Sequence, residues 1–425
     1  MNVDAARKLR EDPSVTAITH APWLKAKETQ ALLAALEAAR AGGSRFVGGC
    51  VRNTLIGAPV DDLDIATQLT PQETIAVATK AGFAAHPTGI EHGTITVVVN
   101  HKPFEVTTLR RDVTTDGRRA TVAFTQSWEE DAQRRDFRMN ALYADAQGQI
   151  HDPTGGGLDD ARTGRVIFIG DAATRIKEDY LRILRFFRFN AWYARSVLDP
   201  QGLQACADHV AGLDTLSVER IWKEVKKLLG APDPRAAWEG MSAIEVRARA
   251  LPELNNTPRL RALMDLEADL MLPVDAMTRI AAALEDQESA KALARRLKLS
   301  NEERDRLVAA LGDDVKITSY MSLREMRRAI YKLGNEAFRD RVMLSWAASG
   351  NDKAQAWRAL VAHAMMWTPP KLPLTGDEIM AAGIPAGPKV GLIMREVEDW
   401  WIDADFPDDK LSVIERLKAV AQGMS

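Results

Sequence analysis

Residues 45–67 read RFVGGCVRNTLIGAPVDDLDIAT, and this stretch decides the fold of the first part of the chain. Residues 45–47 predict a short strand, a pair of glycines follows, and a helix begins near Cys50. Residues 62–66 predict a second strand beyond this helix. Short strands that alternate with helices indicate an α+β fold with a small mixed sheet.

The glycine pair is the first candidate binding feature. Gly48 and Gly49 stand at the strand-to-helix turn, where glycine lets backbone N–H groups approach a phosphate chain. The helix N-terminus adds positive potential, and Arg52 falls in its first turn. The alternative is a plain tight turn with a surface arginine, which is the commoner meaning of two glycines alone.

Three carboxylates further along the chain suit a metal site. On a strand, residues i and i+2 project from one face, so Asp62 and Asp64 would converge while Leu63 turns into the core. Glu105 lies between apolar residues on a strand that could pair beside the first, where a charge is costly unless it is neutralised. Carboxylates that share a face suit Mg²⁺, which leaves positions for substrate phosphates. The alternative is an acidic strand end on a solvated surface.

The rest of the first part continues the α+β pattern. Residues 93–99 and 104–107 predict strands, and a threonine before a proline predicts the start of a helix over residues 71–81. Residues 110–122 are polar and contain a glycine, which favours a mobile loop between strands.

The chain changes character near residue 160. After one more short strand at residues 166–169, helical periodicity dominates to the end. Proline and glycine breaks fall at residues 231–234 and 312–314. The predicted fold is therefore an α+β head followed by helices only. The predicted parts are residues 1–158, 159–232, 233–315 and 316–425.

Composition and charge limit the class of protein. The 425 residues are 46% hydrophobic and 27% charged, which is typical of globular proteins and argues against disorder. No apolar run is as long as a membrane span, and the N-terminus does not resemble a signal peptide, so we expect a cytoplasmic protein. The net charge of -3 argues against indiscriminate binding of nucleic acid, but residues 162–195 hold eight basic and three acidic side chains, a local charge of +5.

Several motifs occur in a characteristic order. They are GGCVRN at residues 48–53, DDLDIAT at 61–67, HGTITVVV at 92–99, FEVTTLRRD at 104–112, RRDFRMNA at 134–141, EDYLR at 178–182 and SVERI at 217–221. Together they closely resemble the class II tRNA nucleotidyltransferase family of the polymerase-beta type. Its members are CCA-adding enzymes and bacterial poly(A) polymerases. One departure is Asn53, where the family usually has Asp, so it is open whether residue 53 holds Arg52.

The resemblance implies roles for the candidate residues. Asp62, Asp64 and Glu105 would be catalytic and bind two Mg²⁺ ions. The candidate nucleotide-binding residues are Gly48, Gly49, Arg52, Arg135, Asp136, Asn140, Asp179, Arg182, Arg185 and Arg188. The four parts of the chain would be a catalytic head, a nucleotide-selecting neck, an RNA-binding body and a tRNA-binding tail.

The motif EDYLR at residues 178–182 would, by the same resemblance, select the nucleotide, and hydrogen bonding offers a reason. Asp179 and Arg182 are at i and i+3, so on one helix both would reach the same side. The carboxylate accepts and the guanidinium donates, which matches the amine and ring acceptor of cytosine and adenine and rejects uracil and guanine. The alternative is an ordinary ion pair within the helix.

The leading hypothesis is addition of C, C and A to the tRNA 3′ end from CTP and ATP, without a nucleic-acid template. A poly(A) polymerase is the nearest rival, but residues 91–96 (EHGTIT) look like the tRNA-repairing branch. Residues 110–122 resemble the flexible loop linked to A addition, which disfavours a CC-adding enzyme and leaves an A-adding one open. The retained metal carboxylates argue against a non-catalytic RNA-binding protein. The long helical part and the basic segment argue against a transferase for small molecules.

Overall fold

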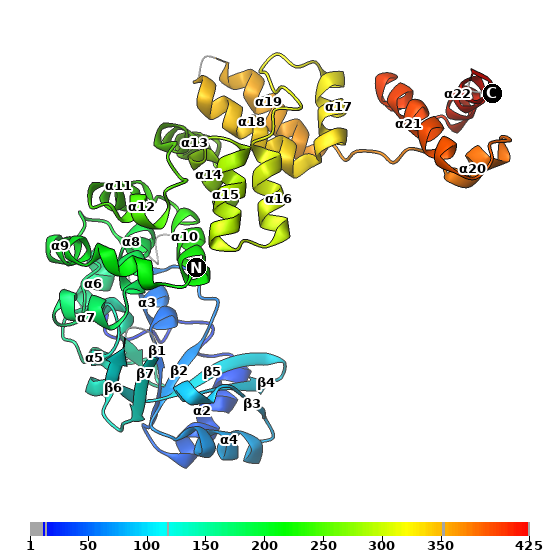
Figure 1. The fold of residues 1–425 in the computed structure, drawn as a ribbon. Coiled ribbons are helices and arrows are strands. Elements are labelled where there is room, and N and C mark those ends of the chain that lie inside the picture. The colour runs from blue at the N-terminus through cyan, green and yellow to red at the C-terminus, as the bar shows by residue number, and fades with distance from the viewer. Residues whose placement is uncertain (1–11, 13–14, 117–118, 351–352, 424–425) are drawn as a thin grey trace. The chain divides into compact units, whose positions relative to one another are not determined.

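The computed structural model describes residues 12, 15–116, 119–350 and 353–423 (Figure 1). The chain forms two compact units, Met1–Pro252 and Glu253–Ser425. The four-part division expected from the sequence stays a prediction.

The first unit is built on a seven-stranded sheet in the order β3-β4-β5-β2-β1-β8-β9. Its strands are β1 (Ser44–Val47), β2 (Asp64–Thr67), β3 (Ala84–Gly89), β4 (Thr94–Val99), β5 (Lys102–Thr108), β8 (Tyr143–Ala144) and β9 (Ile150–His151). Strands β2 and β5 run parallel and every other pair is antiparallel, so the predicted mixed sheet is confirmed.

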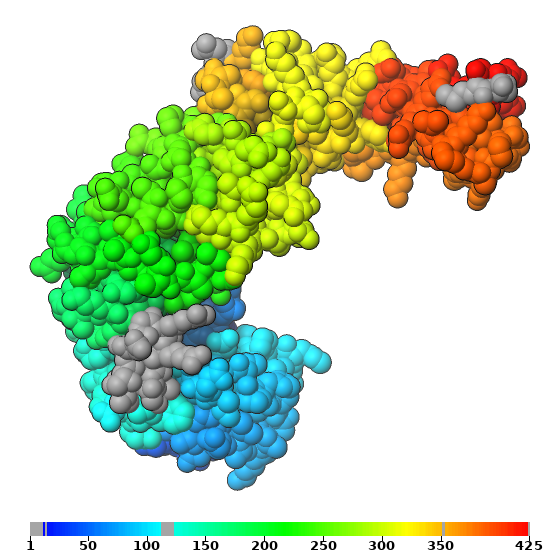
Figure 2. All heavy atoms as spheres, in the orientation of Figure 1, coloured from blue at the N-terminus to red at the C-terminus, as the bar shows by residue number. Residues whose placement is uncertain are grey.

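Residue alternation explains why these segments form strands. In β4 the residues Ile95, Val97 and Val99 are buried while the intervening ones are not, as expected of a strand with one core face. Helices α2 (Lys27–Ala39) and α4 (Pro71–Lys80) pack against the β3–β5 side of the sheet. The predicted helix is confirmed in α4, which starts with a capping box between Thr70 and Glu73. The cyan tip of the β4–β5 hairpin projects from the surface in Figure 2.

Two predicted elements are wrong. Residues 110–122, expected to be a loop, lie in the antiparallel strands β6 (Arg110–Asp116) and β7 (Arg119–Phe124), with residues 117–118 outside the described part. Threonine and valine in both segments favour strands more than the polar composition suggests. The expected strand at residues 166–169 is a single bridge between Phe137 and Phe168, because the partner segment turns into a 3₁₀ helix at Arg138–Asn140 and the pairing ends there.

Helices complete the first unit. They are α3 (Gly49–Ile56), α5 (Trp128–Gln133), α6 (Gly157–Thr163), α7 (Ala172–Glu178), α8 (Leu181–Tyr193), α9 (Pro200–Asp208), α10 (Val218–Leu229), α11 (Arg235–Ala243) and α12 (Val246–Ala250). In α8 the rings of Phe186, Phe187 and Phe189 are buried, and Phe186 stacks on Phe168 at 5.5 Å. Trp192 near the end of the same helix is, in contrast, 43% exposed.

Helices alone form the described part of the second unit. They are α13 (Thr257–Leu270), α14 (Ala276–Ala283), α15 (Gln287–Leu297), α16 (Asn301–Ala310), α17 (Leu323–Leu333), α18 (Asn335–Ser349), α19 (Ala354–Met366), α20 (Gly376–Ala381), α21 (Pro388–Asp403) and α22 (Lys410–Gly423). The last three pack around Ile393, Val397 and Trp401. In the described residues of the whole chain, no helix has the length and apolar character needed to cross a membrane.

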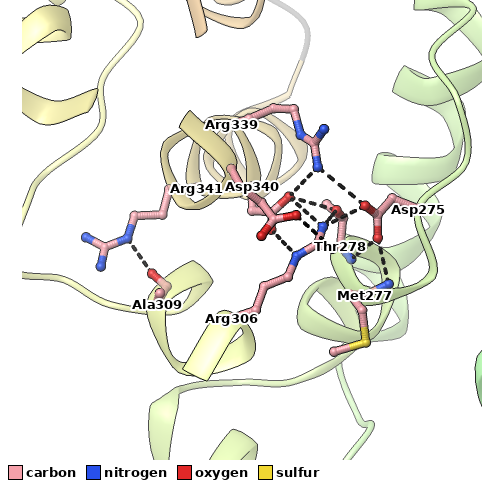
Figure 3. A network of polar contacts seen from close by, with 9 residues as sticks. Asp275, Met277, Thr278, Arg306, Ala309, Arg339, Asp340 and Arg341 are labelled. Atoms are coloured by element: carbon pink, nitrogen blue, oxygen red, sulfur yellow. Dashed lines mark hydrogen bonds and ion pairs between the residues drawn. The ribbon is translucent and has the colours of Figure 1, made fainter. Parts of the chain in front are cut away.

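A buried ion network joins three helices of the second unit (Figure 3). Arg306 of α16 donates hydrogen bonds to two carboxylates. The distance from its Nη2 to Asp275 Oδ2 is 2.6 Å, and that from its Nε to Asp340 Oδ2 is 3.0 Å. Asp340 of α18 is 1% exposed, and Thr278 of α14 donates a hydrogen bond to its other oxygen at 2.8 Å. Arg339 adds a second guanidinium 3.3 Å from Asp340. The buried carboxylate of Asp340 thus depends mainly on Arg306 for its countercharge.

Replacement of this arginine tests the network. We expect Arg306→Met to lower the free energy of unfolding of the second unit by about 3 kcal/mol, because it leaves Asp340 buried without its main cation. Urea denaturation of the full chain measures the change. The matched control is Arg304→Met on the same helix, since Arg304 pairs with Asp305 at the surface, where the side chains are 44% and 66% exposed. The control should change stability by less than about 0.5 kcal/mol; equal effects of the two substitutions would contradict a structural role for the network.

Candidate active site

The glycine turn between β1 and α3 forms one wall of the candidate site. Gly48 has φ +72°, a left-handed conformation that side chains other than glycine rarely adopt, and α3 begins at the next residue, Gly49. The backbone N–H of Gly48 donates to Leu142 O at 3.1 Å, which anchors the turn on the adjacent segment. The predicted strand–glycine–helix arrangement is therefore confirmed.

Arg52 is buried behind this turn and is held by neutral groups. Its Nε and Nη2 donate to Asn53 Oδ1 at 3.1 and 2.9 Å, and Nη2 also donates to the Tyr193 hydroxyl at 2.8 Å. Nη1 donates to Asn140 Oδ1, and the guanidinium lies 4.1 Å from the centre of the Tyr193 ring. Asn53 thus holds Arg52 through its amide oxygen without neutralising it. Burial lowers the pKa of Arg52, as expected when a cation loses its hydration.

A second buried group, Asp136, connects the segment that follows α5 to helix α8. Its Oδ2 accepts hydrogen bonds from Arg185 Nε and Nη2 at 2.7 and 2.5 Å. Its Oδ1 accepts from Asn140 Nδ2 at 3.0 Å and from the backbone N–H of Phe137 at 2.8 Å. Burial alone would raise the pKa of Asp136, but the charge of Arg185 and these hydrogen bonds lower it to about 2.

Arg135 and Arg134 share a buried carboxylate that the sequence analysis missed. Asp131 Oδ2 accepts from Arg135 Nη2 at 3.0 Å and from the Tyr143 hydroxyl at 2.7 Å, while Oδ1 accepts from Arg134 Nε at 2.9 Å. Burial by itself raises the pKa of a carboxyl, but the two arginines hold the pKa of Asp131 well below its usual range. The signal was present, since Asp131 precedes the arginines by three and four residues, the spacing at which side chains on a helix meet.

The three candidate metal carboxylates are arranged differently from the prediction. Asp64 begins β2 and lies in parallel register with Glu105 of β5, so the expected pairing of the two strands is confirmed. Asp62, however, precedes the strand, and the idea that Asp62 and Asp64 alternate along it is wrong. Strand β1 ends at Val47 where the glycine turn begins, so residues before Asp64 have no antiparallel partner there.

The expected burial of Glu105 is also wrong. Its side chain is exposed, whereas the adjacent residues Phe104 and Val106 point into the core. The carboxylates nonetheless influence one another, because burial and the charges of Glu105 and Asp62 raise the pKa of Asp64 to about 6, against the opposing charge of Arg135. Within the described residues, no group of three or more His, Cys, Asp or Glu side chains has a metal-holding arrangement.

Asp179 and Arg182 do not share a helix, contrary to the prediction. Asp179 follows the end of α7 with extended backbone (φ −157°), and Arg182 lies in the first turn of α8. The Asp179 carboxylate accepts the backbone N–H of Leu181 at 3.1 Å, a local contact that competes with helix continuation. Nor do the two side chains pair, since Asp179 contacts Arg220 at 2.6 Å and Arg182 contacts Glu178 at 2.5 Å. The alternative of an ordinary intrahelical pair is therefore wrong too.

A cavity of about 450 Å³ collects most of these groups. It is lined by Gly48, Gly49, Arg52, Asp64, Arg134, Arg135, Asp136, Asn140, Asp179, Leu181, Arg182, Arg185, Phe189 and Arg220. Six arginines face three aspartates here, and the volume is in the range of ordinary ligand sites, so the cavity suits a polyanion such as a triphosphate.

Three predicted site residues do not line this cavity. Asp62 and Glu105 lie outside its lining, and Arg188 pairs with the buried Glu224 of α10. The sequence analysis missed four lining residues. Arg134, Leu181 and Arg220 belong to quoted motifs and could have been found there, whereas Phe189 becomes a neighbour of the site only through the fold.

Comparison with known proteins agrees with the motifs. Residues 44–167 match the family model described as the Poly A polymerase head domain. Residues 197–257 match the model described as the probable RNA and SrmB-binding site of polymerase A.

Relatives extend the match along most of the chain. A CCA-adding enzyme of Streptococcus gordonii is 34% identical over 403 residues, which cover 92% of this chain and 97% of that protein. The mitochondrial CCA tRNA nucleotidyltransferase 1 of Danio rerio is 32% identical over 391 residues, covering 88% of this chain and 86% of the relative. The crystal structure of the Bacillus stearothermophilus CCA-adding enzyme in complex with CTP is 28% identical, has a TM-score of 0.72 and covers 95% of this chain and 100% of that one. This chain therefore belongs to the family of CCA-adding tRNA nucleotidyltransferases and poly(A) polymerases.

Proposed function

We propose that this nucleotidyltransferase adds C, C and A to the 3′ end of tRNA from CTP and ATP, without a nucleic-acid template. The observation that carries the proposal is the single cavity, which joins the glycine turn and Asp64 at one wall to Asp179 and Arg182 at another. A nucleotide in this cavity would have its phosphates near the turn and its base near the selecting pair. The Bacillus stearothermophilus relative was crystallised with CTP, which supports this use of the cavity.

The end of the cavity at the glycine turn is suited to position the triphosphate and to neutralise its charge. Arg52 sits beside a helix N-terminus and a turn without side chains, so backbone N–H groups and a guanidinium would act on the same phosphate group. Nucleotidyl transfer requires little covalent help from the protein, and catalysis comes mainly from holding the reacting groups in line. Arg135 and Asp136 are fixed by Asp131 and Arg185, and they would help to shape the pocket in which the base is selected.

Divalent metal is part of the chemistry of this family, and we propose Mg²⁺ held by Asp62, Asp64 and Glu105. The residue types fit, since carboxylates are the ligands that Mg²⁺ prefers. Burial and the negative charges of Glu105 and Asp62 raise the pKa of Asp64, and a cation would offset both effects. When bound, Mg²⁺ would supply charge neutralisation at the triphosphate and activation of the RNA 3′-hydroxyl. The carboxylates would orient that hydroxyl and the phosphate toward each other.

The base end would select the nucleotide. Asp179 presents a carboxylate that accepts hydrogen bonds, and Arg182 presents a guanidinium that donates them. Cytosine and adenine both carry an amine next to a ring acceptor and would fit this edge, while uracil and guanine carry the reverse order. Because both groups belong to the protein, the selection needs no template strand.

The remaining parts of the chain would serve the RNA. We propose a catalytic head at residues 1–158, a selecting neck at 159–232, and body and tail at 233–315 and 316–425 that bind tRNA. The family match over residues 197–257, described as a probable RNA-binding site, supports an RNA-binding role beyond the head. A cytoplasmic location is the expectation that accompanies this function.

Extension of defined tRNAs tests the proposal. The purified protein with Mg²⁺ would be incubated with tRNAs that end before CCA, after C and after CC, with each of the four nucleotides singly and together. We expect extension from CTP and ATP that stops at CCA, because one cavity accepts only these bases. A long A tail would favour a poly(A) polymerase, addition of A alone would favour an A-adding enzyme, and no extension would contradict the proposal.

Substitution of the metal carboxylates tests the chemistry separately. We expect Asp62→Ala and Asp64→Ala each to lower the incorporation rate by roughly 100-fold or more, because loss of a metal ligand removes transition-state charge stabilisation. The affinity for tRNA, measured by fluorescence anisotropy, should change little. The control is Asp61→Ala, since Asp61 is an exposed neighbour with no assigned role. Wild-type turnover by either of the first two variants would overturn the assignment.

A further inference from the structure

An ion pair at the base end of the cavity involves a residue outside the selecting motif. Arg220 of α10 places Nη2 2.6 Å from Asp179 Oδ2, and both side chains line the cavity. The other oxygen of Asp179 accepts the backbone N–H of Leu181 at 3.1 Å. The Asp179 carboxylate is thus held from two sides, and one of these contacts comes from a separate helix.

The backbone around Asp179 explains why such a contact matters. Asp179 lies at the break between α7 and α8 in extended conformation, so no helix fixes the direction of its side chain. Arg182 is fixed independently, by the Glu178 carboxylate and by the carbonyl oxygens of Arg175 and Arg134, each at 2.9 Å. The two halves of the selecting edge therefore depend on different partners.

Packing of α10 on α8 sets the position of Arg220. Ile221 next to it is buried, and one turn later Glu224 pairs with Arg188 of α8. Glu224 also lies 3.9 Å from Arg185, whose guanidinium binds Asp136 on the opposite side of the cavity. Arg220 thus projects from a helix that is fixed against the same scaffold as the rest of the site.

We propose that Arg220 is a positioning residue for base selection and acts through Asp179. The proposal rests on the function proposed above and adds a residue to its selecting edge. The guanidinium fixes the orientation of the carboxylate through one contact to Oδ2 and leaves other lone pairs for the amine of the base. Without Arg220, the Asp179 carboxylate keeps only its contact with the Leu181 N–H, and its second oxygen loses the partner that fixes its direction. Discrimination between bases, more than nucleotide affinity, then depends on this contact.

Single-nucleotide addition to a tRNA that ends before CCA tests the proposal. For Arg220→Met we expect the ratio of kcat/KM for CTP to that for UTP to fall about tenfold, the size of one lost charge-assisted hydrogen bond. Arg220→Lys keeps the charge and should recover part of the ratio. The matched control is Arg249→Met, since Arg249 pairs with Asp214 outside the cavity at an exposure similar to that of Arg220. The control should leave the ratio unchanged.

A double-mutant cycle separates action through Asp179 from a general effect. In an Asp179→Asn background, Arg220→Met should have no further effect on the ratio. Equal increases of KM for all four nucleotides, with the ratio unchanged, would overturn the proposal and assign Arg220 to the phosphates. An unchanged ratio in Arg220→Met, with CCA addition by the wild type intact, would overturn this inference alone, whereas absence of CCA addition by the wild type would refute the proposed function instead.

Discussion

The buried carboxylate of Asp136 is the contact on which the candidate site depends. It accepts two hydrogen bonds from Arg185 of α8 and one from Asn140, and Asn140 in turn accepts from Arg52 behind the glycine turn. A single run of hydrogen bonds therefore connects α8 to Arg52 behind the glycine turn. A carboxylate that is 6% exposed would be costly to bury without these partners, so its low pKa and the geometry of the site have the same cause.

The arginines around the cavity pair with carboxylates, with one exception. The arginine–carboxylate pairs are Arg134 and Arg135 with Asp131, Arg182 with Glu178, Arg185 with Asp136, Arg188 with Glu224, and Arg220 with Asp179. The hydrogen-bond partners of Arg52 are instead the neutral side chains of Asn53, Asn140 and Tyr193. The paired arginines are fixed in place and define the walls of the cavity. Arg52, in contrast, keeps a charge beside the glycine turn that no carboxylate contact balances within the described residues. We expect a substrate phosphate to provide the missing negative charge, and the family's usual Asp at position 53 would change this balance.

Local sequence signals predicted the elements that depend on local physics. The glycine turn, the capped helix α4 and the alternating strand β4 all form as expected, because caps, turns and alternation act within a few residues. The errors arise where a distant partner decides. Asp62 leaves the strand because β1 ends at Val47, and Asp179 leaves the helix because its carboxylate binds the next turn's backbone. Motif order identified ten of the lining residues, and helical spacing could have found Asp131 beside Arg134 and Arg135. The Glu224 carboxylate, by contrast, becomes a neighbour of Arg188 only when α10 packs on α8.

The central claim is that one cavity, held together by Asp136 and Arg185, receives both nucleotides. Equilibrium binding by titration calorimetry tests it most directly, with CTP and ATP titrated separately and then in competition into the wild type and into Arg185→Met. The account predicts one site per chain, mutual competition between CTP and ATP, and a loss of affinity for both nucleotides by about the same factor in the variant, roughly tenfold for one lost charge-assisted contact. Simultaneous binding of CTP and ATP, or a variant that loses affinity for only one of them, would contradict it.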